Sequence, residues 1–464
     1  MALHSRPLRA AATLALALAC APLFALVEGE LKDKDLTPDG TEKFIIKYAI
    51  EVPKDAPPAD TTDPAKQLGL FLCFHGKGGQ APNEANNVIR IMKGLKILDG
   101  YIVLGAKSQG EGWEEEADVP PVTKLAQWAL KKYAINPRRV YTFGMSSGGN
   151  FSGVFGLAKA DMIAASVVYG SGIYKRGLMA KDPKLDLPDF YMVMGLDDDE
   201  QHKSGSRDTY RRFKELGINV IYREIVGLPH SSFHPPTNDE SIQWAIRQRH
   251  KTIPLSAAET ELLKPIARNA KKIGVDDAGA DALSLVGGFQ AASIVKELLE
   301  HKDAAVRVRA ARVCDRALMG DAITAALAKK VKDKEAEVRA AAFTSLNTGV
   351  NLRYQSAQDT ACFVLDQKKW DLAEKLLVVQ GLTTAIRFQI KAFYQDPPLL
   401  VALVKALDDD ELEVRKAAFA ALKPIQESEY DATMEKSKRR QAIGKWEEWL
   451  AKLLGKEAPK TAGK

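Results

Sequence analysis

The stretch Val140-Tyr-Thr-Phe-Gly-Met-Ser-Ser-Gly-Gly149 decides the fold of the first half of this 464-residue chain. Residues 140–143 are β-branched or aromatic, as in a buried strand, and a helical stretch rich in small residues follows at 150–160. A Gly-x-Ser-x-Gly string between a strand and a helix is typical of a sharp turn that strains the serine backbone and lifts its hydroxyl clear of the sheet. We therefore predict that Ser146 is a nucleophile; the alternative is an ordinary glycine-rich connection.

Short apolar runs of strand length lie on both sides of this turn and alternate with helical patterns. This alternation is typical of a mostly parallel sheet covered by helices, and we expect such an α/β domain over residues 40–250. The runs other than 140–143 are 44–52, 68–74, 101–104, 164–169, 190–194 and 220–226.

A serine hydroxyl becomes a good nucleophile only when a base accepts its proton, so a histidine should follow later in the chain. His230 stands four residues after the predicted strand 220–226, where its imidazole would reach the carboxyl edge of the sheet. His202 and His234 are the other candidates. His234 precedes two prolines, a position that favours shaping the loop. We therefore predict that His230 is the general base.

The base needs a carboxylate that fixes its tautomer and stabilises the imidazolium. Three aspartates, residues 197–199, follow the predicted strand 190–194. Two of them are expected to be solvated residues that cap a helix. Asp198 is the third residue after the glycine that ends the strand, which is a common place for such a carboxylate, and we select it. The order serine, aspartate, histidine, each just after a strand, is that of the α/β-hydrolase fold.

The tetrahedral intermediate of acyl transfer also needs backbone N–H donors for its oxyanion. The amide of Ser147 is one, because the first turn of a helix has free N–H groups. The second should come from the loop His75-Gly-Lys-Gly-Gly79, in which the sequence leaves Lys77 and Gly78 as alternatives. This loop has no Gly-Lys-Ser/Thr ending, so it does not match a phosphate-binding loop.

Trp113 lies in a loop after the predicted strand 101–104, at the same edge of the sheet. It is a candidate for packing against an aromatic acyl group or a sugar, and a purely structural role is the alternative. The domain is just long enough for the sheet and its helices. We therefore expect an open site without a large lid, which suits bulky or polymeric substrates.

Three motifs resemble the secreted esterase family that contains polyhydroxybutyrate depolymerases, feruloyl esterases and acetylxylan esterases. They are His75-Gly-Lys-Gly-Gly79, Ile135-Asn-Pro-Arg-Arg-Val-Tyr141 and Gly144-Met-Ser-Ser-Gly-Gly149. The resemblance covers residues 43–250 and implies hydrolysis of carboxylic esters through an acyl-serine intermediate, with no metal and no cofactor. It carries over Ser146, Asp198 and His230 as the triad. Asn136 departs from the family, which usually has aspartate there, at a position without a catalytic role.

A serine peptidase of the same fold and an inactive, hydrolase-like binding protein are the alternatives to an esterase. The peptidase is disfavoured because neither a propeller nor an acidic specificity pocket is recognisable in the sequence. The binding protein is disfavoured because all three required residue types stand at strand ends. The ester itself, a feruloyl or acetyl group on carbohydrate or a polyhydroxyalkanoate, is left open.

The second half of the chain has a different character, since 23 of the 33 glycines precede residue 251. Residues 255–455 are expected to form helix after helix, and three alanine-rich segments there share a Val-Arg pair. They resemble HEAT repeats, which implies an α-solenoid that binds an unknown protein or polymer partner. The alternative is an ordinary helical domain that covers one face of the first half. The three pairs are Val306-Arg307, Val338-Arg339 and Val414-Arg415.

The division into two halves leads to a prediction about a fragment. No predicted site residue lies beyond residue 250, so a fragment that ends near Arg249 should keep turnover of small soluble esters. If the helices instead cover an apolar face, that fragment should be insoluble or unfolded.

Residues 1–27 are identified as a secretory signal peptide, because Arg6 and Arg9 precede an apolar run that Pro22 interrupts. A retained membrane anchor or lipidation of Cys20 is the alternative, and only these would bring the protein to a membrane. The small number of cysteines favours a bacterial compartment over an animal secretory pathway. We expect a secreted, periplasmic or cell-surface protein.

The charge and the cysteines exclude other classes. The chain has 66 Lys and Arg against 60 Asp and Glu, a net charge of +6 that is too mild for dedicated nucleic-acid binding. Its 4 cysteines form no Cys-x-x-Cys pair, so we expect no zinc site and no disulfide framework.

Overall fold

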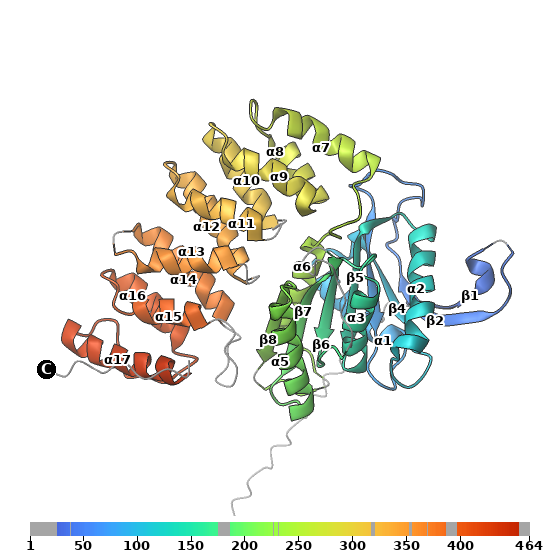
Figure 1. Ribbon diagram of the computed structural model, residues 1–464, viewed down its shortest axis with the longest axis horizontal. Helices are drawn as coiled ribbons and strands as arrows, with labels where there is room; N and C mark the ends of the chain where they lie inside the picture. Colours follow the sequence, from blue (N-terminus) through green and yellow to red (C-terminus); the bar gives the residue numbers. More distant parts are fainter. Residues whose placement is uncertain are drawn as a thin grey trace, which may run out of the picture.

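The computed structural model describes residues 26–37, 39–174, 186–225, 227–230, 232–316, 321–351, 355–368, 370–386 and 397–453. The first half is a sheet flanked by helices, and the second half is an arc of helices (Figure 1). Nearly all of the predicted signal peptide lies outside the described residues.

The sheet has eight strands in the order β1-β2-β4-β3-β5-β6-β7-β8. Strand β2 is antiparallel to β1 and β4, and the other neighbours are parallel. Such a sheet, with a serine on a sharp strand-to-helix turn, is α/β-hydrolase-like. The strands are β1 (Val27–Lys32), β2 (Phe44–Glu51), β3 (Leu68–Phe74), β4 (Tyr101–Ala106), β5 (Ile135–Met145), β6 (Ala165–Tyr169), β7 (Asp189–Gly195) and β8 (Val220–Ile225).

Strand β1 begins before residue 40, the predicted start of the domain, and it includes Val27, the last residue of the predicted signal peptide. In the structure Val27 pairs with Ile50, so the sheet begins at Val27. The sequence Val-Glu-Gly-Glu-Leu-Lys is too polar to stand out as a strand. Edge strands are often charged, because charge prevents pairing with other chains.

Helices cover both faces of the sheet because successive strand residues point to opposite sides. Residues such as Phe71, Tyr141 and Val193 pack with α1 (Pro82–Gly94) and α6 (Pro235–Arg247). Residues of the opposite face pack with α2 (Glu115–Lys132), α3 (Ser147–Ala158) and α5 (Glu200–Glu215). The carboxyl ends of the parallel strands are left at one edge, where the candidate site lies.

The second half consists of helices that pack in two rows. Helix α10 packs on α12, α12 on α14 and α14 on α16, while α9, α11, α13, α15 and α17 form the other row. The assignment of these helices to HEAT repeats stays a prediction. They are α7 (Ala257–Asn269), α8 (Asp277–Val286), α9 (Gly288–Leu299), α10 (Ala304–Arg316), α11 (Asp321–Ala328), α12 (Ala336–Asn351), α13 (Gln355–Asp366), α14 (Leu372–Ile386), α15 (Pro397–Ala406), α16 (Leu412–Leu422) and α17 (Lys436–Leu453). Short 3-10 helices lie at Asp33–Asp35, Leu98–Gly100 and Lys329–Lys332.

The two halves share one apolar core and a buried ion pair. A single hydrophobic cluster runs from Phe71 in the sheet through Trp244 of α6 to Trp446 of α17. Between the halves, Arg138 Nη1 lies 3.0 Å from Glu259 Oε1 at the start of α7, with both side chains buried. The guanidinium also donates to the carbonyl oxygens that end α8. The first helices of the second half are therefore part of the packing of the first.

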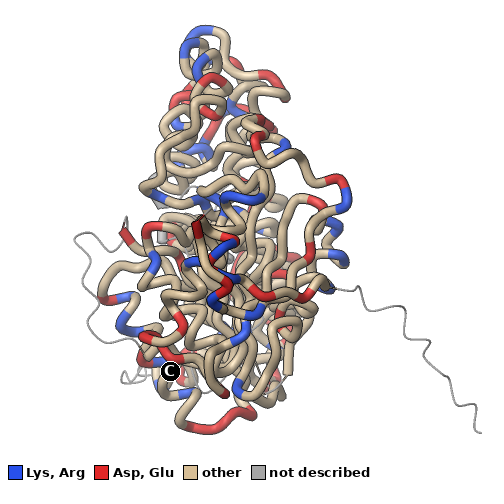
Figure 2. The backbone as a smooth tube through the Cα atoms, turned by 90° about the vertical axis from the view of Figure 1, so that its right-hand side faces the viewer, with Lys and Arg blue, Asp and Glu red and all other residues tan. Residues whose placement is uncertain are grey.

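Two further features of the fold are the distribution of its charged residues and the hydropathy of its helices. Lys and Arg are interspersed with Asp and Glu over the side of the molecule that Figure 2 shows. Within the described part of the chain, no helix is both long and apolar enough to span a membrane.

Candidate active site

The turn between β5 and α3 has the strained geometry expected of a nucleophile. Ser146 has φ 57° and ψ −122°, a left-handed conformation that is unusual for a residue other than glycine. Its N–H donates to the carbonyl oxygen of Tyr169 at 2.8 Å, which holds the turn against β6. A Cβ atom on Gly144 or Gly148 would overlap the backbone of the turn or of β3. The glycines therefore allow the tight approach that lifts the Ser146 hydroxyl above the sheet.

The structure brings together the serine, the histidine and the aspartate selected from the sequence. His230 Nε2 lies 2.7 Å from Ser146 Oγ, and His230 Nδ1 lies 2.7 Å from Asp198 Oδ2. These two hydrogen bonds place the imidazole proton on Nδ1, which donates it to the carboxylate. Nε2 is then free of a proton and can accept the one from serine. Ser146 follows β5, Asp198 follows β7 and His230 follows β8, so the parallel sheet itself makes the three meet.

The neighbours of the chosen aspartate and histidine have other roles. Asp198 is buried, whereas Asp197 and Asp199 are exposed. Asp199 is the N-cap of α5 and accepts the backbone N–H of His202 at 2.8 Å, a bond that lowers the pKa of the Asp199 carboxyl. His234 precedes α6, and its Nδ1 lies 2.7 Å from Thr237 Oγ1.

Backbone bonds tie the loops of the aspartate and the histidine to each other. The N–H of Asp197 donates to Leu228 at 3.2 Å, and that of Leu196 donates to Ile225 at 2.9 Å. A Cβ atom on Gly195 would overlap the Leu228 carbonyl, so this crossing needs a glycine.

The structure separates the two candidates for the second oxyanion donor. The Gly78 amide donates to the carbonyl oxygen of Glu111 at 2.6 Å. It therefore cannot donate to an oxyanion, and the prediction of Gly78 as a donor is corrected. Among the described residues, the Lys77 amide has no protein acceptor. Gly76 lies beside the serine, because a Cβ atom on it would be 3.7 Å from Ser146 Cβ. The Ser147 amide, at the first position of α3, is the other donor without an intrahelical acceptor.

His75 is a residue that the sequence reasoning missed. Its ring is buried, with Nδ1 2.6 Å from the Gly76 carbonyl oxygen and Nε2 3.1 Å from the Ser108 N–H that donates to it. Burial lowers the pKa of His75, which favours the neutral ring that these two bonds require. The ring thus fixes the oxyanion loop against the end of β4. Its place as the first residue of the glycine-rich loop 75–79 is the signal that points to it in the sequence.

Trp113 has the structural role that was the alternative to substrate binding. Its ring is 8% exposed and stacks on Phe151 with centroids 4.5 Å apart. Its Nε1–H donates to the carbonyl oxygen of His75 at 2.8 Å, and its backbone N–H donates to Ser147 Oγ at 3.2 Å. The indole therefore holds the oxyanion loop through the His75 carbonyl and is packed against Phe151, so the assignment of Trp113 to substrate binding is corrected.

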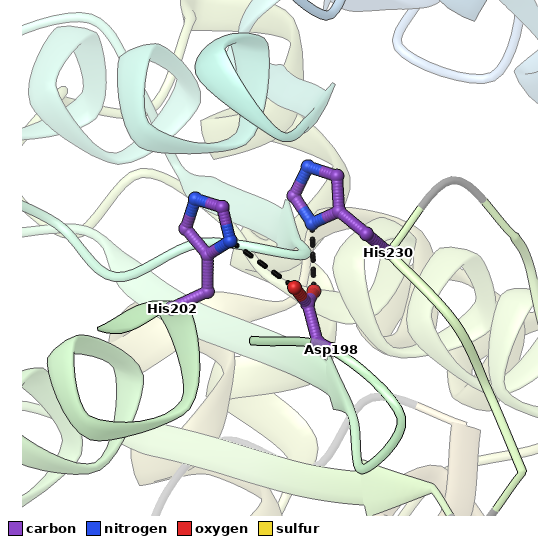
Figure 3. A group of neighbouring side chains, drawn as sticks. All are labelled: Asp198, His202 and His230. Carbon is purple, nitrogen blue, oxygen red and sulfur yellow. Dashed lines mark hydrogen bonds and ion pairs between the residues drawn. The ribbon is translucent and has the colours of Figure 1, made fainter. Parts of the chain in front are cut away.

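A second histidine meets the same carboxylate (Figure 3). His202 Nδ1 lies 3.1 Å from Asp198 Oδ1, and its ring stacks on that of His230 with centroids 4.5 Å apart and 12° between the planes. Nothing in the sequence singles out His202, because its link to Asp198 depends on the turn that begins α5. Within the described residues, Asp198, His202 and His230 could share a metal ion, since their ligand atoms lie within 4.8 Å of one another. Such an ion would compete for the His230 Nδ1 atom that faces Asp198.

The known proteins to which this chain is similar include several esterases. No family model matches the chain. A probable acetylxylan esterase A of Aspergillus clavatus is 28% identical over 121 residues, which are 24% of this chain and 38% of that relative. The match thus spans well under half of the relative's length.

Solved structures with a similar fold also include esterases. An acetyl xylan esterase from Aspergillus awamori has 15% identity and a TM-score of 0.36, covering 47% of this chain and 98% of its own. A ferulic acid esterase has 17% identity and a TM-score of 0.38, covering 48% and 97%. A thermostable esterase has 20% identity and a TM-score of 0.38, covering 49% and 64%. In each of these comparisons, the protein that this chain resembles is an esterase.

Proposed function

We propose that the protein is a serine hydrolase that cleaves carboxylic esters through an acyl-serine intermediate. The observation that carries the proposal is the hydrogen-bonded chain from Ser146 Oγ through His230 to Asp198. Each residue has a distinct role in it: the nucleophile, the base and the carboxylate that orients the base.

The first half of the reaction makes the acyl-enzyme. Ser146 Oγ attacks the ester carbonyl carbon while His230 Nε2 takes the hydroxyl proton, and the carbonyl oxygen becomes an oxyanion. The amides of Ser147 and Lys77 donate to that oxygen, and one such donor is typically worth a factor of about 10²–10³ in kcat. His230 then gives its proton to the alcohol oxygen as the C–O bond breaks. Asp198 stabilises the imidazolium throughout.

The second half of the reaction repeats these steps with water. His230 takes a proton from a water molecule whose oxygen attacks the acyl carbon, and then returns that proton to Ser146 Oγ as the acid leaves. The side chain of His230 is 36% exposed, which gives water and substrate access to the base.

The substrate class is the finer part of the proposal. The acetylxylan esterase likeness supports an acetyl group on carbohydrate. A feruloyl group on carbohydrate and a polyhydroxyalkanoate are also in keeping with an open site. We further propose that the protein is exported and that the second half recruits the polymer or a protein partner. The structure assigns no side chain to the acyl group, because Trp113 is committed to packing.

A panel of substrates tests the proposal. Short acyl nitrophenyl esters, methyl ferulate, acetylated xylan and a peptide amide are compared with wild-type protein and Ser146→Ala. Turnover of esters by the wild type alone is expected. Turnover of the peptide amide in preference to every ester would replace the esterase by a peptidase. Equal activity in both proteins would remove Ser146 as the nucleophile.

A further inference from the structure

We propose that His202 is a positioning residue of the triad, which orients the Asp198 carboxylate and the His230 ring without touching the substrate. This inference rests on the proposed function. The Asp198 side chain is 1% exposed, so its oxygens depend on protein donors. Oδ2 faces His230, while Oδ1 accepts the Asp199 N–H at 2.8 Å and faces His202 Nδ1 at 3.1 Å. With both oxygens bound, the carboxylate is held in one orientation.

Capping of α5 does not by itself account for this placement. His202 is the third residue of the helix, and its Nδ1 also lies 2.8 Å from Asp199 Oδ2. The Asp199 carboxylate is 59% exposed, so water can donate hydrogen bonds to it. The buried Asp198 carboxylate has no such replacement, and the loss of one protein donor costs it more free energy. The hydrogen bond from His202 Nδ1 therefore stabilises Asp198 more than it stabilises Asp199.

The stacked rings provide a second, independent contact. The His202 and His230 planes differ by 12° at a centroid distance of 4.5 Å. Rotation of the His230 ring out of this plane would carry Nε2 away from Ser146 Oγ, 2.7 Å distant. The His202 ring covers one face of the base and restricts that rotation.

Two variants of His202 separate the donor from the ring. His202→Asn places an amide N–H where Nδ1 stands and loses the ring, whereas His202→Phe keeps a ring and loses the donor. Gln201→Ala, at the exposed neighbouring position on the same helix turn, is the control. Two properties are measured: kcat and KM on nitrophenyl acetate, and the rate at which a fluorophosphonate labels Ser146. In labelling, the Ser146 oxygen forms a bond to phosphorus, fluoride leaves and His230 takes the proton.

The variants should differ in rate. His202→Phe is expected to lose about tenfold in kcat and in labelling rate, with KM unchanged, because the base is misplaced while substrate binding is not touched. His202→Asn restores the donor and should lose only about twofold to threefold, and Gln201→Ala should match the wild type. Unchanged rates in both His202 variants would overturn the proposal, as would equal losses in the two variants.

The two readouts also distinguish this inference from the proposed function. Labelling needs the triad but no particular substrate class. If the wild type is labelled at Ser146 but hydrolyses no ester, the esterase proposal fails while the His202 comparison remains valid. If esters are hydrolysed and labelling is indifferent to His202, only the positioning role fails.

Discussion

At the scale of single residues, the serine and its base have no substitute within the site. Ser146→Ala removes the nucleophile, and we expect a loss of at least about 10³-fold in kcat on a nitrophenyl ester. His230→Ala should be as damaging. Because the two act as a unit, the double variant should be no slower than either single one. Multiplying losses in the double variant would show that the two residues act separately.

The three consecutive aspartates make a matched set at the same scale. Asp198→Asn keeps the shape of the side chain, but the neutral amide cannot stabilise the imidazolium of His230. We expect a loss of about 10³–10⁴-fold in kcat. Asp199→Asn keeps a good N-cap on α5, and Asp197→Asn alters an exposed side chain. Both should stay within about threefold of the wild type. A large loss in Asp197→Asn with an active Asp198→Asn would show that the loop after β7 is wrongly assigned.

At the scale of elements, two buried histidines make stability depend on pH. Burial lowers the pKa of His75, which holds the loop after β3, and of His250, which follows α6. The unfolded chain takes up these protons near about pH 6.5, whereas the folded chain does so only at lower pH. Unfolded protein therefore binds more protons in this window, and the free energy of unfolding should fall as the pH falls below about 6.5.

Urea unfolding followed by circular dichroism at about pH 7.5 and about pH 5.5 measures this effect. His250→Gln retains a donor for the carbonyl oxygen of Ala160, which His250 Nε2 meets at 2.8 Å, and should show a smaller drop between the two pH values. If the free energy of unfolding falls by the same amount in the variant, His250 does not contribute to the pH dependence of stability.

The arginines of the repeated Val-Arg pairs hold adjacent helices of the second half together. The valines of the three pairs are buried. Each arginine donates through Nη1 to the carbonyl oxygens five and six positions earlier. Arg307 and Arg339 also pair with Asp333 and Glu374, whereas Arg415 instead donates to the carbonyl oxygen of Ala432. The Nη1 acceptors are His301 and Lys302, Asp333 and Lys334, and Asp409 and Asp410.

We expect Arg307→Ala to lower the free energy of unfolding by about 3 kcal/mol, because it leaves a buried carboxylate and two carbonyl groups without their donor. Lys416→Ala removes one side of the exposed pair with Glu413 and should cost less than about 0.5 kcal/mol. Guanidinium unfolding of the full chain compares them. Equal unfolding midpoints for the two variants would show that Arg307 contributes no more to stability than the exposed Lys416.

At the scale of the whole molecule, the boundary near residue 250 is a boundary of sequence character and not of packing. A fragment that ends at Arg249 would keep Arg138 but lose Glu259 and the carbonyl oxygens of α8. It would also cut through the continuous apolar cluster. We therefore expect this fragment to be insoluble or unfolded, which was the second of the two outcomes considered from the sequence.

Variants of the full chain test this interface without truncation. Glu259→Ala leaves the Arg138 guanidinium buried without its carboxylate and should destabilise the protein by about 3–5 kcal/mol. The double variant Arg138→Met/Glu259→Met replaces the pair by apolar side chains and should recover most of that loss. Thermal unfolding gives the comparison. A soluble, fully active fragment 26–249 would contradict the shared core.

The sequence by itself determined the alternating strands and helices, the strained serine, and the aspartate and histidine that meet it. These follow from local chemistry: Ser146, Asp198 and His230 each stand just after a strand, and parallel strands end at one edge. Only the tertiary structure decided that the Gly78 amide is occupied, that Trp113 is packed under the oxyanion loop, and that His202 shares the carboxylate. Contacts of this kind join loops from different strands. Their formation depends on the angle and distance at which those loops pass, and residue type and spacing along the chain do not specify either.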